Sequence, residues 1–416
     1  MLDRLRASLP VLRHRDFRLL FGGQAISVVG DALFPVALAF AVLELSGSAT
    51  SLGLVLAAQA LPLVLLVLVG GVVGDRFSRQ RIMVVSDVAR AAVQAVAAGL
   101  LIGGVAEIWH LAVLAGLYGA AEAFFRPAAG GLLPRVVPSD DLQEANGLIG
   151  VSQSLGLVLG PGLAGILIAL FGPGSAIAID AASFLVSAAC VLAMSPIAST
   201  RLADEDASQT QFLAELKEGF REVSSRSWMW MFMLVIAGYH LIALPCVLAL
   251  GPLVADRELD GASSWAIIVA MFGVGAMLGS ALALRLKPRR PMVGCGVAFL
   301  GAACQPAIIA GAGSTFVIGG FELLAGICVA YGFTLWDTTL GREVPPHALS
   351  RVTSFDWFTA IGMMPLGYAL VGPLADSAGL HPTMYAATGI MVCLVAASLT
   401  LPGVRGLEHV RPATVA

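Results

Sequence analysis

Charge is scarce in this chain of 416 residues, of which only 12% are charged. An average soluble domain carries roughly 25%. So few charged side chains do not cover a water-facing surface of this size, which argues against a soluble enzyme. Basic residues are not in excess, because 24 lysines and arginines stand against 27 aspartates and glutamates. This balance disfavours a protein that binds nucleic acid.

The chain also lacks the usual patterns of metal sites and hydrolases. Its six cysteines lie in apolar segments and none forms a C-x-x-C pair, so we expect inert thiols rather than disulfides or metal ligands. No H-E-x-x-H, G-x-S-x-G or phosphate-binding G-x-x-x-x-G-K-S/T motif is present. We therefore expect no catalytic residue, no metal and no cofactor.

Hydrophobic residues make up 58% of the chain and are gathered in long runs without charge. One such run lies between Glu44 and Asp75, and another between Glu144 and Asp180. Runs of this length fit membrane-spanning helices of about 20 residues. Their continuous apolar character excludes the alternating pattern of a transmembrane β-barrel. The sequence predicts an all-α polytopic membrane protein with twelve helices, near 16–43, 48–74, 81–103, 108–127, 144–170, 175–196, 227–252, 263–285, 291–311, 315–338, 352–375 and 381–401.

Arginines and lysines gather on one side of this twelve-helix arrangement. The N-terminal arm and the loop at 76–81 are rich in arginine, whereas the loops on the opposite side contain only Arg257. The positive-inside rule then predicts that both termini are cytoplasmic. Lysine is limited to Lys217 and Lys287. That scarcity suggests a GC-rich bacterial genome, so we expect the cytoplasmic membrane of a bacterium.

The two halves of the sequence resemble each other. The segment that starts at Leu133 matches the one at Leu340, and Gly160 matches Gly367, at a shift of about 207 residues. A parallel repeat of two six-helix units is a recognised plan of secondary transporters, with the substrate site between the halves. The predicted domains are an N-terminal six-helix bundle at 1–196, a cytoplasmic linker with an amphipathic helix at 197–226, and a C-terminal six-helix bundle at 227–416.

A basic motif, Gly-Gly-Val-Val-Gly-Asp-Arg-Phe-Ser-Arg-Gln-Arg, follows the second predicted helix. It resembles the loop signature of the major facilitator superfamily, G-x-x-x-D-R-x-x-R-R/K, with Ser78 where the family usually has Gly. The alternative is an ordinary basic loop. Gly71 and Gly74 would let two helices approach closely. The resemblance implies a conformational latch against the eleventh helix, formed by Gly71, Asp75, Arg76, Arg79 and Arg81.

Glycines recur along the fifth predicted helix. The segment around Pro161 resembles the G-P-x-x-G signature of the antiporter branch of the superfamily, with one extra residue before the last Gly. Its residues are Gly156, Gly160, Pro161 and Gly165. We expect Gly156-x-x-x-Gly160 to pack on Gly275-x-x-x-Gly279 of the eighth helix. Generic close packing of helices is the alternative.

Three further segments are similar to an exporter branch of the superfamily that includes enterobactin exporters and macrolide efflux proteins. They are Phe125-Arg-Pro-Ala128, the segment 134–138 and Asp180-Ala-Ala-Ser-Phe184. The resemblance covers nearly the whole chain. It implies the major facilitator fold, with two six-helix bundles related by a pseudo-two-fold axis, and a transporter that functions as a monomer.

A few charged residues lie inside the predicted helices. A carboxylate at the centre of a helix costs roughly 2.5–3.5 kcal/mol by insertion scales, and proton uptake would remove its charge. We expect Asp31 to carry protons, with a structural hydrogen bond as the alternative. Glu122 and Arg126 are four residues apart and can pair, either structurally or as a gated, protonatable pair. We interpret Asp87 and Arg90 as a structural pair.

In the family, the first, fourth, seventh and tenth helices line the substrate cavity. The resemblance places a mixture of aromatic and polar residues there, which would suit an amphiphilic organic molecule, including a cationic one. Packing or lipid-facing roles are the alternative for each aromatic. Besides Asp31 and Glu122, the cavity residues are Gln24, Phe34, Tyr118, Tyr239, His240, Glu322, Tyr331 and Trp336.

These observations favour a secondary active transporter in the lipid bilayer. We expect a proton-coupled exporter of a small organic molecule such as a drug, antibiotic or siderophore, driven by the proton gradient and working by alternating access. An import symporter of the same fold, a membrane-embedded enzyme, and a non-transporting receptor or scaffold are the alternatives.

Overall fold

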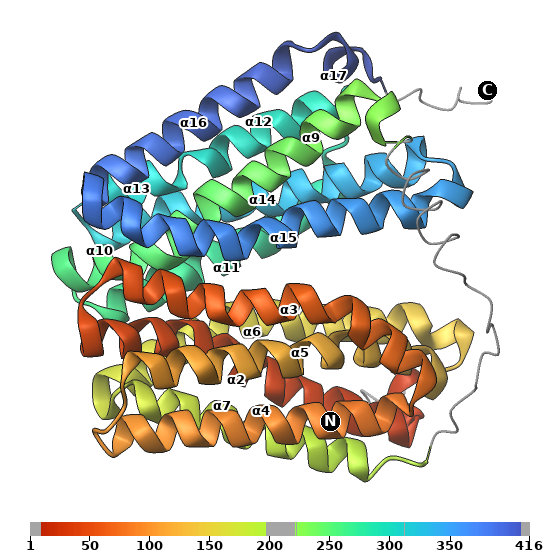
Figure 1. Ribbon diagram of the computed structural model, residues 1–416. Helices are drawn as coiled ribbons and strands as arrows, with labels where there is room; N and C mark the ends of the chain where they lie inside the picture. Colours follow the sequence, from red (N-terminus) through yellow and green to blue (C-terminus); the bar gives the residue numbers. More distant parts are fainter. Residues whose placement is uncertain (1–9, 197–220, 222, 312, 409–416) are drawn as a thin grey trace. The chain divides into compact units, whose positions relative to one another are not determined.

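The described chain is entirely helical. The computed structural model describes residues 10–196, 221, 223–311 and 313–408. The side chains at 68, 72, 75, 346, 347, 350 and 351 are not described. Within this part there is no strand, and 12 helices are long and apolar enough to cross a membrane (Figure 1). The predicted number of twelve is confirmed.

The chain divides into two compact units, each considered by itself. One comprises Met1–Ala203 with Ala255–Ala270, and the other comprises Asp204–Val254 with Met271–Ala416, as far as these residues are described. The predicted amphipathic linker helix falls almost wholly on 197–220 and 222, outside the described residues. The boundaries predicted for the three domains stay a prediction.

The first unit contains the six helices drawn from red to yellow-green in Figure 1. They are α2 (Arg15–Ser46), α3 (Ala49–Arg76), α4 (Arg79–Ile102), α5 (Ile108–Val136), α6 (Leu142–Phe171) and α7 (Pro173–Leu192). Short 3-10 turns lie at Pro10–Arg13 and Ser139–Asp141. Helix α5 runs through Pro127 and Pro134, so its predicted end at 127 was wrong.

The remaining helices are drawn from green to blue. They are α9 (Ser227–Gly238), the π-helical segments η3 (Tyr239–Ala243) and η4 (Cys246–Leu250), α10 (Gly251–Glu258), α11 (Ala262–Arg285), α12 (Pro291–Ala303), α13 (Gln305–Gly311), α14 (Thr315–Glu343), α15 (Pro346–Ala378), α16 (Leu380–Thr400) and α17 (Pro402–Gly406). The seventh span therefore joins α9 to α10 through two π segments. Such local widenings of a helix are frequent at functional sites.

The two halves that resemble each other in sequence also share a turn between helices. Gly172 joins α6 to α7 at φ 77°, and Gly379 joins α15 to α16 at φ 97°. Both lie in the backbone region that side chains with a Cβ atom rarely adopt, so glycine is needed at each turn. The two turns occupy equivalent places in the two halves.

The repeat also extends to helix contacts. Gly160 of α6 lies so close to Ala32 of α2 that a Cβ atom there would overlap with it. Gly367 of α15 is equally close to the carbonyl group of Leu241 and to Pro245. Small residues let helices approach closely, which is a main source of packing energy inside membranes.

Lipid-compatible surfaces surround these contacts. Leu65, Phe171, Leu284 and Phe316 are each more than half exposed, at 64%, 70%, 76% and 79%. Monomeric soluble proteins rarely expose contiguous apolar surface on this scale. The exposed apolar side chains therefore agree with a protein whose helices face the hydrocarbon of a bilayer.

Candidate functional site

Asp31 of α2 is the centre of a polar cluster in the first unit. Its Oδ1 atom accepts a hydrogen bond from the Tyr118 hydroxyl group of α5 at 2.9 Å, and Ser27 Oγ lies 3.5 Å from Oδ2. The side chain of Asp31 is 35% exposed. Hydrogen-bond donors fix the carboxyl group of Asp31, and part of it remains exposed. Such a group is suited to bind either a proton or another cation.

Arg90 of α4 is the buried cation of this cluster. Its guanidinium group lies 2.5 Å from Asp87 Oδ1 and 3.5 Å from Asp31 Oδ1, and its side chain is 2% exposed. The rings of Phe125 and Phe184 lie on it at 4.2 and 4.1 Å from the guanidinium carbon to the ring centroids. Cation–π contacts of this kind hold a desolvated guanidinium group in place.

The structure thus changes the interpretation of Asp87 and Arg90 as a purely structural pair. Arg90 bridges Asp87 to Asp31, and it lines the same cavity as Asp31. One sequence signal could have indicated this role, because Asp87, Arg90 and Gln94 are spaced as i, i+3 and i+7 on one face of a helix.

Glu122 and Arg126 of α5 pair as predicted from their spacing. Arg126 Nε and Nη2 both donate to Glu122 Oε1, at 2.9 and 2.5 Å. Arg126 is 51% exposed and Glu122 is 14% exposed. The pair therefore lies at the accessible edge of the cluster, whereas Arg90 lies in its interior.

A cavity of about 460 Å³ opens beside these charges. It is lined by α2, α4, α5 and α6, and all of its walls belong to the first unit. Gln24, Asp31, Glu122 and Arg126 were predicted for the site, and the structure brings them together there. Its other lining residues are Leu20, Ser27, Val28, Arg90, Phe125, Ala129, Gly130, Leu133, Asn146, Ile149 and Gln153.

Two of the predicted aromatic residues pack beside the cluster without lining its cavity. Phe34 and Tyr118 are both buried, and their ring centroids lie 4.7 Å apart. Neither lines the cavity. Tyr118 acts on the site through its hydroxyl group, and Phe34 through its packing against Tyr118.

A third buried carboxyl group was not among the predicted site residues. Asp180 of α7 is 0% exposed and accepts a hydrogen bond from Gln94 Nε2 at 2.8 Å. No basic side chain among the described residues lies within ion-pair distance of it. It sits beside the small residue Gly30, next to Asp31 in the chain.

Most of the predicted residues of the second unit are buried, and His240 is half-buried. Tyr239, Glu322, Tyr331 and Trp336 are buried there, and none of them lines either cavity described in this section. Trp336 packs against Trp228 and Phe232, and the Tyr331 hydroxyl group donates to the carbonyl of Leu286 at 3.1 Å. His240 Nδ1 donates to the carbonyl of Ile236 at 2.9 Å.

The predicted latch is described only in part. The side chain of Asp75 lies outside the described residues, and Arg76 is exposed. Arg79 Nη1 donates to the carbonyl of Gly131 in α5 at 2.5 Å, and its Nε atom lies 3.4 Å from the carbonyl of Gly74. Arg79 therefore fixes the start of α4 to the ends of α3 and α5.

Within the first unit, α3 makes its close approach at Gly70, which lies directly against the backbone of Ala123 in α5. The next residue, Gly71, is turned away from this contact, because a helix turns by about 100° per residue. The expected approach of Gly71 and Gly74 to the eleventh helix stays a prediction.

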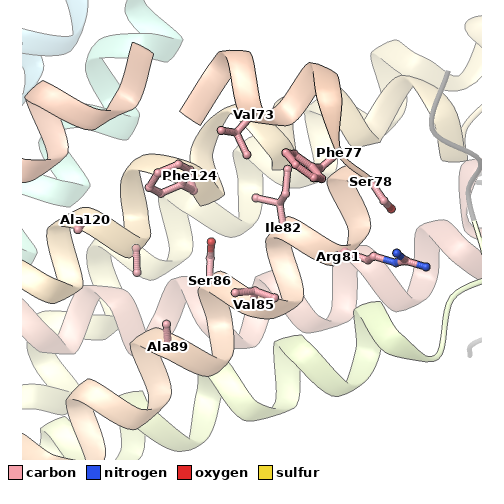
Figure 2. A pocket seen from close by; sticks show the side chains of 11 residues that line it. Val73, Phe77, Ser78, Arg81, Ile82, Val85, Ser86, Ala89, Ala120 and Phe124 are labelled. Atoms are coloured by element: carbon pink, nitrogen blue, oxygen red, sulfur yellow. The ribbon is translucent and has the colours of Figure 1, made fainter. Parts of the chain in front are cut away.

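Arg81 lies at a second cavity of about 460 Å³, which is almost wholly apolar (Figure 2). Helices α3, α4 and α5 line it through Val73, Phe77, Val85, Phe124 and their neighbours. In Figure 2 the guanidinium group of Arg81 points away from the apolar side chains. The latch motif thus borders an apolar groove rather than the charged cavity.

The glycines of the antiporter-type motif pack differently from the expectation. Gly156 and Gly160 approach Val28 and Ala32 of α2, and not the eighth helix. Gly165 alone faces α11, at Ala262 and Ala266, and Pro161 is buried within α6.

The expected partners in the eighth helix have other neighbours. Gly275 and Gly279 of α11 pack on the backbone at Leu323 and Ile327 of α14. Spacing alone identifies a glycine face, but it does not identify the helix that meets it.

Comparisons with known proteins agree with this fold. The family model of the Major Facilitator Superfamily matches residues 20–359. The chain is 30% identical over 403 residues to the multidrug efflux pump Tap of Mycolicibacterium fortuitum, covering 91% of this chain and 94% of that protein. It is 22% identical over 397 residues to macrolide efflux protein A of Streptococcus pyogenes, covering 94% and 97% of the two chains.

Solved structures support the same architecture. A bacterial homolog of the human lysosomal transporter Spinster superposes with a TM-score of 0.73 at 16% identity, covering 96% of this chain and 99% of that one. The nucleoside transporter NupG gives a TM-score of 0.73 at 15% identity, with 92% and 98% covered. With its twelve apolar helices and its match to the family model over most of its length, the chain is a multi-pass membrane transporter that belongs to the major facilitator superfamily.

Proposed function

We propose that this transporter exports an amphiphilic, cationic small organic molecule in exchange for protons, by alternating access. The observation that carries the proposal is the cluster of Asp31, Asp87 and Arg90 at the charged cavity, where two carboxyl groups share one buried guanidinium group. Relatives named as a multidrug efflux pump and a macrolide efflux protein support export.

The charges of the cluster do not balance when all its acids are ionised. Arg90 is closer to Asp87 than to Asp31, at 2.5 against 3.5 Å, and Arg126 is already paired with Glu122. Among the three carboxyl groups that contact Arg90 or Arg126, Asp31 is therefore the one whose charge is least compensated. A carboxylate within a membrane-spanning helix is costly unless it is neutralised, so Asp31, which faces the cavity, requires either a proton or a cation from it.

This competition supplies a mechanism for exchange. A cationic substrate that enters the cavity would take the place of the proton on Asp31, and the released proton would leave to the cytoplasm. Protonation of Asp31 from the other side of the membrane would then expel the substrate. Exchange of one proton for one substrate cation moves no net charge, so the pH difference across the membrane drives it. A difference of one pH unit is worth about 1.4 kcal/mol, which sustains a substrate gradient of roughly tenfold.

The membrane, the orientation and the oligomeric state are also part of the proposal. We place the transporter in the bacterial plasma membrane with both termini in the cytoplasm and with the monomer as the working unit. The excess of arginine in alternate loops supports this orientation.

The test is the substitution Asp31→Asn in everted membrane vesicles, with a fluorescent amphiphilic cation supplied in the outer medium and its uptake into the vesicles measured. We expect proton-driven dye transport to fall by at least about tenfold, equivalent to ~1.4 kcal/mol, with protein abundance close to normal. Asp140→Asn, at an exposed carboxyl group of the same unit, is the matched control and should transport normally. Unaltered pumping by Asp31→Asn, or wild-type transport that persists when a protonophore collapses the gradient, would refute proton coupling through Asp31.

A further inference from the structure

The second unit contains a buried acidic side chain that no ion pair explains. Glu322 of α14 is 2% exposed. Its Oε2 atom accepts a hydrogen bond from Gln305 Nε2 of α13 at 2.8 Å, and its Oε1 atom is buried without a hydrogen-bond partner. Buried carboxyl oxygens normally have partners, so the bare Oε1 atom requires an explanation.

Two uncharged residues fix the other side of this carboxyl group. The hydroxyl group of Tyr239, in the π segment η3, donates to Gln305 Oε1 at 3.1 Å. That bond directs the amide nitrogen of Gln305 towards Glu322. Gln305 and Tyr239 are themselves 2% and 3% exposed, so the chain of three side chains is closed to solvent.

The elements that supply Tyr239 and Gln305 contain no lysine or arginine, and their one histidine, His240 of η3, donates through Nδ1 to the carbonyl of Ile236. Helix α12 has no charged residue, α13 has none, and the part of α11 in this unit has only Arg285 at its last position. Tyr368 of α15 is buried and brings an uncharged phenol. Among the described residues, no lysine, arginine or histidine lies within ion-pair distance of the carboxyl group.

An ionised carboxylate in such a place would lack both a cation and a second hydrogen bond. Burying an unpaired charge is far more costly than burying a neutral acid. The neutral acid is the less costly form, because Oε2 accepts from the amide and the Oε1 atom, which has no partner, then carries a hydrogen and no charge.

We propose that Glu322 is a proton-binding site of the second unit, with Gln305 and Tyr239 as its positioning residues. The ligand is a single proton on the Oε1 atom. The proton is retained while the three side chains are closed to water and is released when Oε1 becomes hydrated.

This site is separate from the Asp31 cluster in both residues and chemistry. Its consequence for coupling rests on the proposed function, because a transporter with one proton-binding carboxyl group in each unit would exchange more than one proton per substrate. The binding of the proton itself does not depend on transport.

The test is infrared spectroscopy of the purified full-length transporter in lipid nanodiscs at neutral pH. We expect Glu322→Gln to remove part of the carbonyl stretching band of protonated carboxyl groups and to leave the carboxylate bands unchanged. Glu343→Gln, an exposed glutamate at the end of the same helix, is the matched control and should leave the protonated band intact.

A second variant keeps Glu322 in place in case Glu322→Gln does not fold. In Gln305→Leu the carboxyl group loses its hydrogen-bond donor, so the same band component should move to higher frequency. Tyr239→Phe should produce a smaller shift in that direction. Loss of a carboxylate band in Glu322→Gln, or an unmoved protonated band in Gln305→Leu, would overturn the proposal even if Asp31-dependent transport is confirmed.

Discussion

The two units pack their helices alike, but among the described residues only the first pairs acids inside its helices with a buried guanidinium group. In the first unit Arg90 compensates Asp87 and Asp31, and the cluster opens on a cavity. In the second unit Glu322 has no cation, and an amide and a phenol hold it in a closed interior. Glycine contacts that fix neighbouring helices recur in both.

This difference indicates which features the repeat preserves within the chain. Gly160 and Gly367 make equivalent helix contacts, and Gly172 and Gly379 make equivalent turns. The ionisable groups do not correspond in this way. Helix packing depends on small residues at fixed positions, whereas a charged site can be built from any helix that faces the interior of its unit.

The largest change in stability should follow from removal of Arg90, the buried cation of the first unit. Arg90→Ala leaves Asp87 buried and unpaired, and breaking a buried ion pair in this way costs about 3–5 kcal/mol. We expect a strongly lowered melting temperature in detergent and little folded protein. Arg126→Ala removes an arginine that is 51% exposed, and should cost no more than about 1 kcal/mol. Equal melting temperatures for the two variants would show that Arg90 does not hold the cluster together.

A smaller effect should appear equally in both units when the repeated glycines acquire a Cβ atom. Gly160→Ala and Gly367→Ala force the atom against a neighbouring helix, which should destabilise each unit by about 1–3 kcal/mol.

The controls for that pair are Gly162→Ala in α6 and Gly362→Ala in α15, where a Cβ atom meets nothing within 4 Å. Since alanine favours a helix over glycine by up to ~1 kcal/mol, these two should keep or raise the melting temperature. The same sign of change in all four variants would contradict the packing argument.

The smallest effects should come from the two tyrosines whose hydroxyl groups position carboxyl groups inside the helices, directly or through an amide. Tyr118 donates directly to Asp31, whereas Tyr239 reaches Glu322 only through Gln305. A lost hydrogen bond of about 0.5–1.5 kcal/mol corresponds to roughly two- to tenfold. Tyr118→Phe should therefore slow proton-driven dye transport by about that factor, and Tyr239→Phe by less. If Tyr239→Phe slows transport more than Tyr118→Phe, the carboxyl group of Glu322 matters more for proton coupling than that of Asp31.

Local interactions were predictable from the sequence because they involve residues on one helix. The spacing of Glu122 and Arg126 was sufficient to predict their pair, and the apolar runs were sufficient to predict twelve helices. The spacing did not indicate that Arg90 contacts Asp31 on another helix, or that Gly156 and Gly160 pack on α2. Those contacts depend on which helices are neighbours, and helical periodicity identifies a face without naming its partner.

By itself, the sequence determined a helical membrane protein with a repeated half, because hydrocarbon admits only segments whose backbone hydrogen bonds are satisfied internally. It also placed acidic groups within those helices. Only the tertiary structure decided which of these acids receives a cation, because residues as distant in the chain as Asp31 and Arg90 meet only when α2, α4 and α5 pack together. For the same reason, only the tertiary structure showed that Glu322 of α14 has an amide partner and that its Oε1 atom has none.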